Sequence, residues 1–482
     1  MTARLAGDGR RPLIVALLTV IGIASYNNLS AAAALPDIGD DLGSIPLLPF
    51  VITIELLTSA VAILAAGPVV DSFGARRVFR VAAIGFIVAS IAVAASPTMP
   101  ALLGARAVQG IFAGAIMTVG VASIGLAIPE VLRPRAFAMT SAVWGVMGVA
   151  GPAIAAVLVA TVGWRGIFLV NIPVTAVAAV AGWNRIPDRH AAATHQRADR
   201  RGIALVAVIT TAALACASYQ LVMIAVALAI LLVTVPLYLR WSRRTPDPVV
   251  RIPHLIDSRY RSVHLTSMAV LAGGVGANSL LPLYLRTVRG QSNSVAAFGV
   301  LFLTVGWSMS AWVSSKLQDR YKAEWVSLLG AVIATPAAII TAITIWADAP
   351  LGAVYAVFFW LGAGVGMVTS TGAALLQSRT RADEMGRLSG AHQFLRTLSI
   401  TFGIAIVGAI TLAVVDSRTG NVELVRDLLS DDDGVVISAD VLRSISDGFA
   451  IAIGVTSVVV AGSLLSALHL VRRRGQGVAS AP

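Results

Sequence analysis

Long apolar blocks alternate with short polar segments along almost the whole chain. Each block holds roughly twenty residues, which is the length that a helix needs to cross a hydrocarbon layer about 30 Å thick. Transmembrane β-strands would instead give alternating segments of about ten residues. The pattern therefore predicts an all-α membrane protein. The fourteen expected spans are residues 12–35, 46–69, 78–96, 99–127, 137–162, 166–184, 202–218, 220–239, 262–285, 294–315, 325–346, 350–376, 388–413 and 447–471.

The positions of the Lys and Arg residues predict which side of the membrane each loop faces. With the N-terminus in the cytoplasm, most of the 36 basic residues fall in cytoplasmic segments, as topology rules expect. A thirteen-helix alternative merges the two helices around ACASYQ (215–220) and moves the basic VRRRGQ (471–476) outside. The charge pattern therefore favours fourteen helices with both termini in the cytoplasm. The longest outer loop, 414–446, is acidic, and its VELVRDLL (422–429) is either a short amphipathic helix or a solvated loop.

The composition supports this class and excludes others. The chain is 57% hydrophobic and 12% charged, whereas about a quarter of the residues in a soluble domain are charged. The net charge of +12 is spread over short loops, so it indicates topology rather than a nucleic-acid surface. A single cysteine, Cys216, excludes a disulfide framework or a four-cysteine metal site within the chain. The sequence shows no nucleophile paired with a general base, so nothing in it indicates an enzyme.

Two loops of the chain resemble each other. GPVVDSFGARR (67–77) follows the second span, and SKLQDRYKAEW (315–325) follows the tenth. Aligned on Asp71 and Asp319, they resemble a well-preserved copy and a decayed copy of one motif. Such a repeat is typical of transporters, which often arise by duplication.

The first copy has a simple physical interpretation. Gly67 ends one helix, Gly74 allows a tight turn, and Asp71, Arg76 and Arg77 supply charges that can pair across a cytoplasmic gap. These residues are therefore candidates for a gating loop. Ordinary positive-inside loop charge is the alternative.

Further motifs lie in order along the chain, and together with this loop they closely resemble the major facilitator superfamily. Within it they are similar to the fourteen-helix drug:proton antiporter branch. The motifs are ALPDI (34–38), LLGARAVQGIFAGA (102–115), GVMGVAGPAIAA (145–156), WRGIFLVNIP (164–173) and QFLRTLSITFGIAI (393–406).

The resemblance implies a major facilitator fold. Residues 1–186 would form one six-helix bundle, and residues 262–482 a second bundle that carries the outer loop. The linker, 187–261, would hold two added helices. Rocking of the bundles would expose a central cavity to each side in turn. The chain has no phosphate-binding loop of the G-x-x-x-x-G-K-[ST] type, so an ion gradient rather than ATP is the expected energy source.

The sequence departs from the branch at two positions. The branch carries an aspartate nine residues before the proline that ends span 1, and here that residue is Asn27. In span 2, an aromatic residue is usual at the position of Glu55. An acid is thus absent at one position and present at another. Gly148, Gly151 and Pro152 follow the helix motif that the family associates with antiport.

Depth in the membrane links these positions. At 1.5 Å per residue, Asn27, Glu55 and Arg106 each lie about 12–14 Å from the outer ends of their helices. We therefore expect them to form one cluster. Glu55 would then be a protonatable coupling group, or a site for a cationic substrate. The alternative is a permanent salt bridge with Arg106 that neutralises both groups.

In the second half, His392 and Arg396 lie four residues apart on one helical face. Arg396 matches a position that is usually Arg in the branch. His392 would be either a second titrating group or a hydrogen-bonded histidine.

The expected function is secondary export of amphipathic drugs or other organic compounds, exchanged for protons, across a bacterial inner membrane. The expected partners are a cationic, neutral or lipid-like substrate and membrane lipids, with no nucleic acid and no cofactor beyond the proton gradient. The expected state is a monomer. One alternative is an exporter of an endogenous lipid or metabolite with weak or altered coupling, and another is a transport-inactive scaffold or sensor.

Overall fold

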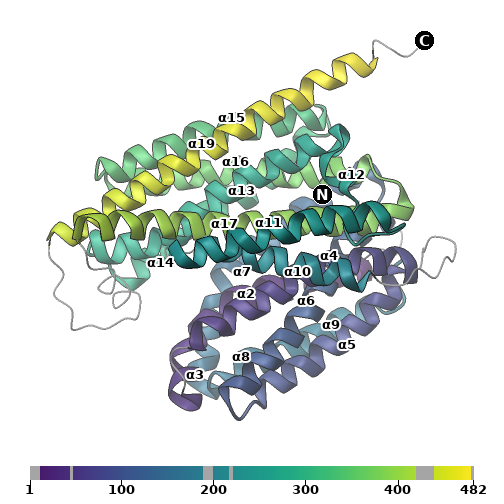
Figure 1. Cartoon of the computed structure of the whole chain (residues 1–482), viewed down its shortest axis with the longest axis horizontal. Helices are drawn as coiled ribbons and strands as arrows, with labels where there is room; N and C mark the ends of the chain where they lie inside the picture. Colours follow the sequence, from purple (N-terminus) through teal and green to yellow (C-terminus); the bar gives the residue numbers. More distant parts are fainter. Residues whose placement is uncertain (1–10, 44–46, 188–198, 217–220, 420–438, 479–482) are drawn as a thin grey trace. The chain divides into compact units, whose positions relative to one another are not determined.

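The computed structural model describes residues 11–43, 47–187, 199–216, 221–419 and 439–478. Within these ranges the chain forms helices and no strands (Figure 1). The longer helices are α2 (Arg11–Ser30), α3 (Leu35–Leu42), α4 (Leu48–Phe73), α5 (Ala75–Ala94), α6 (Met99–Ala127), α7 (Arg133–Val162), α9 (Asn171–Gly182), α10 (Arg200–Ala215), α11 (Leu221–Arg244), α13 (Ser258–Leu283), α14 (Asn293–Leu317), α15 (Ala323–Trp346), α16 (Leu351–Ser378), α17 (Met385–Thr419) and α19 (Ala439–Val478). Short helical segments are η1 (Ala31–Ala34), η3 (Glu130–Leu132), α8 (Arg165–Leu169), α12 (Ile252–Ile256), η4 (Tyr284–Val288) and η5 (Ala382–Glu384).

Each of the fourteen ranges that the sequence predicts to be spans is mostly helical over the residues that the structure describes. In the described part of the chain, eleven helices are long and apolar enough to cross a membrane, or twelve if the two parts of a bent helix form one span. The apolar part of α2, Arg11–Asn27, is shorter than this requirement. The chain is thus a multi-pass helical membrane protein, and the count of fourteen stays a prediction. Residues 422–429 of the outer loop lie outside the described residues, as does most of ACASYQ.

The chain divides into two compact units, and each contains segments from both halves of the sequence. The first unit comprises Met1–Thr210, Val235–Asp257 and Leu376–Phe394. The second comprises Thr211–Thr234, Ser258–Leu375 and Leu395–Pro482. The first unit therefore includes the first ten residues of α17.

In the first unit, two glycines bring α4 and α6 into close contact. A Cβ atom at Gly110 would meet the carbonyl oxygen of Glu55, and one at Gly114 would meet the carbonyl oxygen of Ser59. Small residues at four-residue spacing allow helix backbones to approach in this way. The close packing fixes the level of Glu55 relative to α6.

The same unit brings the last turns of α4 against the first turn of α17. A Cβ atom at Gly67 would lie 2.8 Å from the carbonyl oxygen of Gly386, and one at Gly390 would lie 2.9 Å from that of Ile63. The helix α4 ends at Phe73 and is followed by Gly74, whose φ of 82° is readily adopted only by glycine. A Cβ atom at Gly386 would lie 2.5 Å from Oδ1 of Asp71, so the close approach also brings this carboxylate against the start of α17.

In the second unit, α19 packs along α13 and α15 (Figure 1). Its core includes the fully buried side chains of Leu271, Phe358 and Phe449. Gly403 of α17 contacts the backbone of Ala272 in α13, so small residues again set a close helix approach.

Candidate functional site

A buried polar cluster lies where α2, α4 and α6 meet in the first unit. The amide nitrogen of Asn27 donates a 3.0 Å hydrogen bond to Oε1 of Glu55. An Nη atom of Arg106 lies 3.7 Å from Oε2 of Glu55, and the other donates to Oδ1 of Asn27 at 3.3 Å. All three residues are at most 2% exposed. The structure thus brings together the three residues that the sequence predicts to lie at the same depth in the membrane.

Arg106 makes more contacts outside this triad than within it. Its Nε donates to the carbonyl oxygen of Val51 at 3.0 Å, and Nη1 donates to Oε1 of Gln109 at 2.7 Å. Gln109 in turn donates to the hydroxyl of Ser90 at 3.0 Å. The guanidinium carbon lies 5.4 Å from the ring centre of Phe168. Arg106 is therefore held in place independently of the protonation state of Glu55.

The two carboxylate oxygens of Glu55 have different surroundings. Oε1 accepts the hydrogen bond from Asn27, whereas Oε2 accepts none from the described residues and lies near Arg106 at ion-pair distance only. A proton placed on Oε2 would break no hydrogen bond seen here. The cluster can thus hold Glu55 as a carboxylate paired with Arg106, or as an acid that leaves Arg106 supported by Val51 and Gln109.

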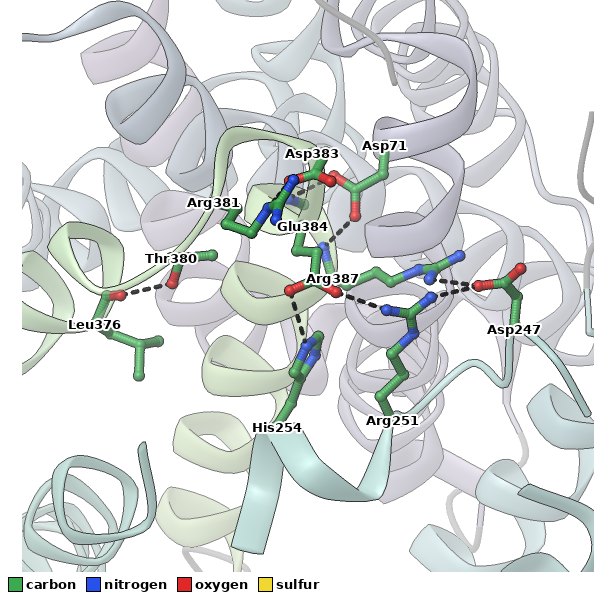
Figure 2. Close-up of polar contacts among 11 residues, drawn as sticks. Asp71, Asp247, Arg251, His254, Leu376, Thr380, Arg381, Asp383, Glu384 and Arg387 are labelled. Atoms are coloured by element: carbon green, nitrogen blue, oxygen red, sulfur yellow. Dashed lines mark hydrogen bonds and ion pairs between the residues drawn. The ribbon is translucent and has the colours of Figure 1, made fainter. Parts of the chain in front are cut away.

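A second polar site lies at the end of α4 (Figure 2). The carboxylate of Asp71 accepts hydrogen bonds from the backbone N–H groups of Gly386, at 2.7 Å, and Arg387, at 2.8 Å. These groups belong to the first turn of α17, where N–H groups lack partners within the helix and the helix dipole favours an anion. Asp71 therefore acts as an N-terminal cap supplied by another helix. We call this arrangement the α17 latch.

The side chain of Arg387 extends the latch into a network of charges. It donates to Oδ1 of Asp247 at 2.8 Å, and Arg251 donates to the same atom at 2.6 Å. Arg251 also donates to Glu384 at 2.6 Å, and Nε2 of His254 lies 3.5 Å from the second oxygen of Glu384. Figure 2 shows these side chains meeting beside Asp71.

Burial, hydrogen bonds and nearby charges together determine how the groups of this network ionise. Asp247 is partly buried, which opposes its ionisation, but the hydrogen bonds from Arg251 and Arg387 hold its pKa below the usual value. Burial lowers the pKa of His254, Glu384 raises it, and Arg251 and Arg387 lower it, with a net decrease. The network therefore contains an ionised Asp247 and a neutral His254 near neutral pH.

Gly67 of the predicted gating loop lies against the backbone of Gly386 in the latch, and the charged residues of the two loop copies have other surroundings. The Nε of Arg76 donates to the carbonyl oxygen of Ile186 at 2.9 Å. Arg77 is exposed. Asp319, which aligns with Asp71 in the second copy of the loop, is exposed as well. Gly67 forms the close contact between α4 and α17, and Gly74 forms the turn after α4.

The remaining predicted residues lie in two helices. His392 is 3% exposed and Arg396 is partly exposed, both in α17. Gly148 and Gly151 lie in α7, and the side chain of Pro152 is outside the described part. His392 belongs to the first unit, as Glu55 does, and Arg396 belongs to the second.

Sequence reasoning missed the charged residues around the latch. Asp247 and Arg251 are spaced i, i+4, and Glu384 lies just before the start of α17, three residues ahead of Arg387. Both signals are visible in the sequence, but each also fits an ordinary charged loop. Gln109 is three residues from Arg106, a spacing that places both on one face of α6.

A multi-pass helical fold with a buried charge cluster within the apolar helices is typical of membrane transport proteins. The sequence model of the Major Facilitator Superfamily matches residues 15–404. The chain belongs to this family.

Curated relatives and solved structures agree with this assignment. An uncharacterized MFS-type transporter of Mycobacterium tuberculosis is 27% identical over 430 residues, and the match covers 86% of this chain. The chain spans 61% of the length of that relative. The tetracenomycin C resistance and export protein of Streptomyces glaucescens is 27% identical over 428 residues, covering 85% of this chain and 77% of its own. The structure of the human organic anion transporter MFSD10 has the same fold, with a TM-score of 0.65 at 14% identity, covering 96% of this chain and 99% of its own.

Proposed function

We propose that the chain is a secondary exporter of amphipathic organic compounds that exchanges its substrate for protons by alternating access. Family membership supports transport, and the name of the Streptomyces relative supports export of an organic compound. The observation that carries the proton step is Glu55, a fully buried carboxylate whose Oε2 accepts no hydrogen bond from the described residues.

The proposed cycle uses the two forms of Glu55. When Glu55 is ionised, Arg106 balances its charge across 3.7 Å. When Glu55 takes a proton, Arg106 keeps its bonds to Val51 and Gln109, so the cluster survives the change of charge. Glu55 is buried here, so proton exchange requires a second state in which water reaches it. Rocking between two states would supply that access.

The α17 latch is the proposed gate on the cytoplasmic side. Asp71 joins the end of α4 to the first turn of α17. A second tie lies in the same unit, because Arg133 donates to the carbonyl oxygens of Gln377 and Gly125, at 3.2 Å and 2.8 Å. Gln377 also donates to the carbonyl oxygen of Val121 at 2.8 Å. Opening this side would require these contacts to break.

The alternative is an exporter of an endogenous lipid or metabolite with weak coupling. Asn27 favours it, because the branch that the sequence resembles has an acid there. In that case Glu55 and Arg106 would stay paired throughout the cycle.

The test is dye efflux from proteoliposomes under an imposed pH gradient, with ethidium as a cationic probe, fluorescein as an anionic probe and a fluorescent phospholipid. Wild type is compared with Glu55→Gln and with Glu324→Gln, a matched control at another buried glutamate. We expect Glu55→Gln to lose at least tenfold in gradient-driven efflux and Glu324→Gln to retain it. Equal gradient-driven efflux by Glu55→Gln and wild type would reject the coupling role. Export of the phospholipid alone would favour the alternative.

A further inference from the structure

The helices α10 and α11, which are predicted to be added between the two bundles, are joined to the segment that follows them by buried hydrogen bonds. The hydroxyl of Tyr238 in α11 donates to the carbonyl oxygen of Val250 and accepts from its N–H, both at 3.0 Å. Ser242 donates to the same carbonyl oxygen at 3.3 Å. Val250 is 6% exposed, so these contacts replace water at a buried peptide group. The segment after α11 is therefore fixed to that helix.

Asp199, the residue just before α10, holds the same segment. Asp199 accepts hydrogen bonds from the N–H of Gly202 at 2.8 Å and from the indole N–H of Trp241 at 2.8 Å. Its other oxygen accepts from the N–H of Val249 at 3.1 Å. One carboxylate thus connects the start of α10, the end of α11 and the residues that follow.

The residues on either side of Val249 and Val250 contact the start of α17 and the residue before it. Asp247 accepts from Arg387, and Arg251 donates to Glu384, as described above. The side chains of Asp247 and Arg387 are 16% and 8% exposed. This ion pair is therefore better shielded than a surface pair. The backbone N–H of Arg387 is at the same time one of the two donors to Asp71.

Arg387 thus belongs to two interactions at once, since its backbone is in the α17 latch and its side chain is bound to Asp247. Displacing the side chain would pull on the helix turn whose N–H groups meet Asp71. We propose that Asp247 and Arg251 are positioning residues through which the added helix pair holds the first turn of α17 in the latch. This inference deepens the proposed gate and rests on it. We call Asp247, Arg251 and His254 together the brace.

The role assigned to the brace gives the added helices a function in the transport cycle. A shift of α10 or α11 would move Val249 and Val250, and through Asp247 it would move Arg387. Each link is a hydrogen bond or ion pair within the first unit. The helix pair would then bias the opening of the gate without touching the substrate.

Hydrogen–deuterium exchange of the full-length protein in detergent tests the brace directly. The N–H groups of Gly386 and Arg387 are the latch donors, so peptides that cover residues 383–390 report on the latch itself. The variants are Asp71→Asn, Asp247→Asn, Arg251→Gln and the conservative Asp247→Glu. The control is Asp383→Asn, which removes the exposed pair with Arg381 in the same loop.

We expect Asp71→Asn to speed exchange in this peptide by tenfold or more, and Asp247→Asn and Arg251→Gln to speed it three- to tenfold. Asp383→Asn should leave it unchanged, and Asp247→Glu should restore most of the protection. Peptides from α5 should exchange as in wild type in every variant, which separates loss of the latch from global unfolding.

A binding measurement adds a second test. Weakening closure enlarges the fraction of molecules that are open to the cytoplasm, so ethidium added to the protein in detergent should bind two- to fivefold more tightly to Asp247→Asn. If Asp71→Asn speeds exchange but Asp247→Asn and Arg251→Gln do not, the brace is rejected and the gate stands. If Asp71→Asn itself leaves exchange unchanged, the latch and the brace are both rejected.

Discussion

Arg106 and Glu55 form a charge pair in which the two partners are unequally supported. The nearest atoms, Nη2 of Arg106 and Oε2 of Glu55, are 3.7 Å apart. Arg106 has hydrogen-bond partners in Val51, Asn27 and Gln109. Among the described residues, Asn27 alone donates a side-chain hydrogen bond to the carboxylate of Glu55. Neutralising Glu55 should therefore disturb the cluster less than neutralising Arg106.

The first prediction follows from this asymmetry. Arg106→Gln leaves a buried carboxylate without a counter-charge, which costs about 3 kcal/mol or more. Glu55→Gln leaves Arg106 with its hydrogen bonds and should cost about half as much. The double variant, which buries two neutral amides, should be more stable than Arg106→Gln alone. Thermal unfolding of the purified protein in detergent measures all three.

The double-mutant cycle also separates the two interpretations of the pair. A coupling energy of ~1 kcal/mol or more would show that the charges interact directly. Effects that simply add would mean that Arg106 acts through Val51 and Gln109 alone, and the pair would then have no part in stability.

The sequence located much of this cluster because helix geometry converts residue number into depth. Counting from the helix ends placed Asn27, Glu55 and Arg106 at one level, and the structure brings them into contact. The count carries no information on how each helix is rotated about its axis. The contact of Arg106 with the carbonyl oxygen of Val51 depends on that rotation, so it could not be predicted.

The latch was harder to predict, because its partners are far apart in the sequence. Asp71 was recognised as a gating residue, but it contacts backbone N–H groups more than 300 residues away, and any residue type can supply such a group. Asp247 and Arg251 lie in a linker, where charges are common. Their role depends on contacts with Arg387 and Glu384 at the start of α17, and these contacts are set by the tertiary structure.

The second prediction concerns the close contact of α4 and α6. Gly110→Ala places a methyl group against the carbonyl oxygen of Glu55 and the hydroxyl of Thr58, so the helices must separate. Overpacking of this kind costs about 1–3 kcal/mol. We expect a lower unfolding temperature and reduced efflux, because the level of Glu55 relative to Arg106 changes.

Gly104 is the matched control, since it lies in the same helix and a Cβ atom there meets nothing within 4 Å. Gly104→Ala should be neutral or stabilising by up to ~1 kcal/mol, because alanine favours a helix over glycine. Equal losses in the two variants would contradict the role assigned to Gly110.

The third prediction compares the two copies of the repeated loop. Asp71→Asn keeps the size of the side chain but removes the charge that faces the first turn of α17, which should cost about 1 kcal/mol. Asp319→Asn changes an exposed residue and should stay within ~0.5 kcal/mol of wild type. In proteoliposomes, Asp71→Asn should change the rate of ethidium efflux several-fold and Asp319→Asn should not. The opposite order would show that the second copy carries the gate.

The fourth prediction is a pH dependence centred on His254. Burial and the nearby Arg251 and Arg387 outweigh the opposing effect of Glu384, so the pKa of His254 falls below its ordinary value of 6.5. A base with a lowered pKa in the folded state contributes stability above pH 6.5, and that stability is lost as the pH falls through the folded-state pKa. Asp247, whose pKa is below its ordinary value of 3.8, stays ionised over this range.

Wild type should therefore unfold at a lower temperature at pH 5 than at pH 7, and His254→Gln should lose less over the same interval. Glu384→Gln removes the group that favours protonation of His254, so the folded-state pKa of His254 falls further. Its loss of stability should therefore continue to a lower pH, and be larger, than in wild type. Scanning calorimetry at half-unit pH steps measures both effects. An identical pH profile for wild type and His254→Gln would show that other groups set the acid sensitivity, because only the histidine of the brace is altered in that comparison.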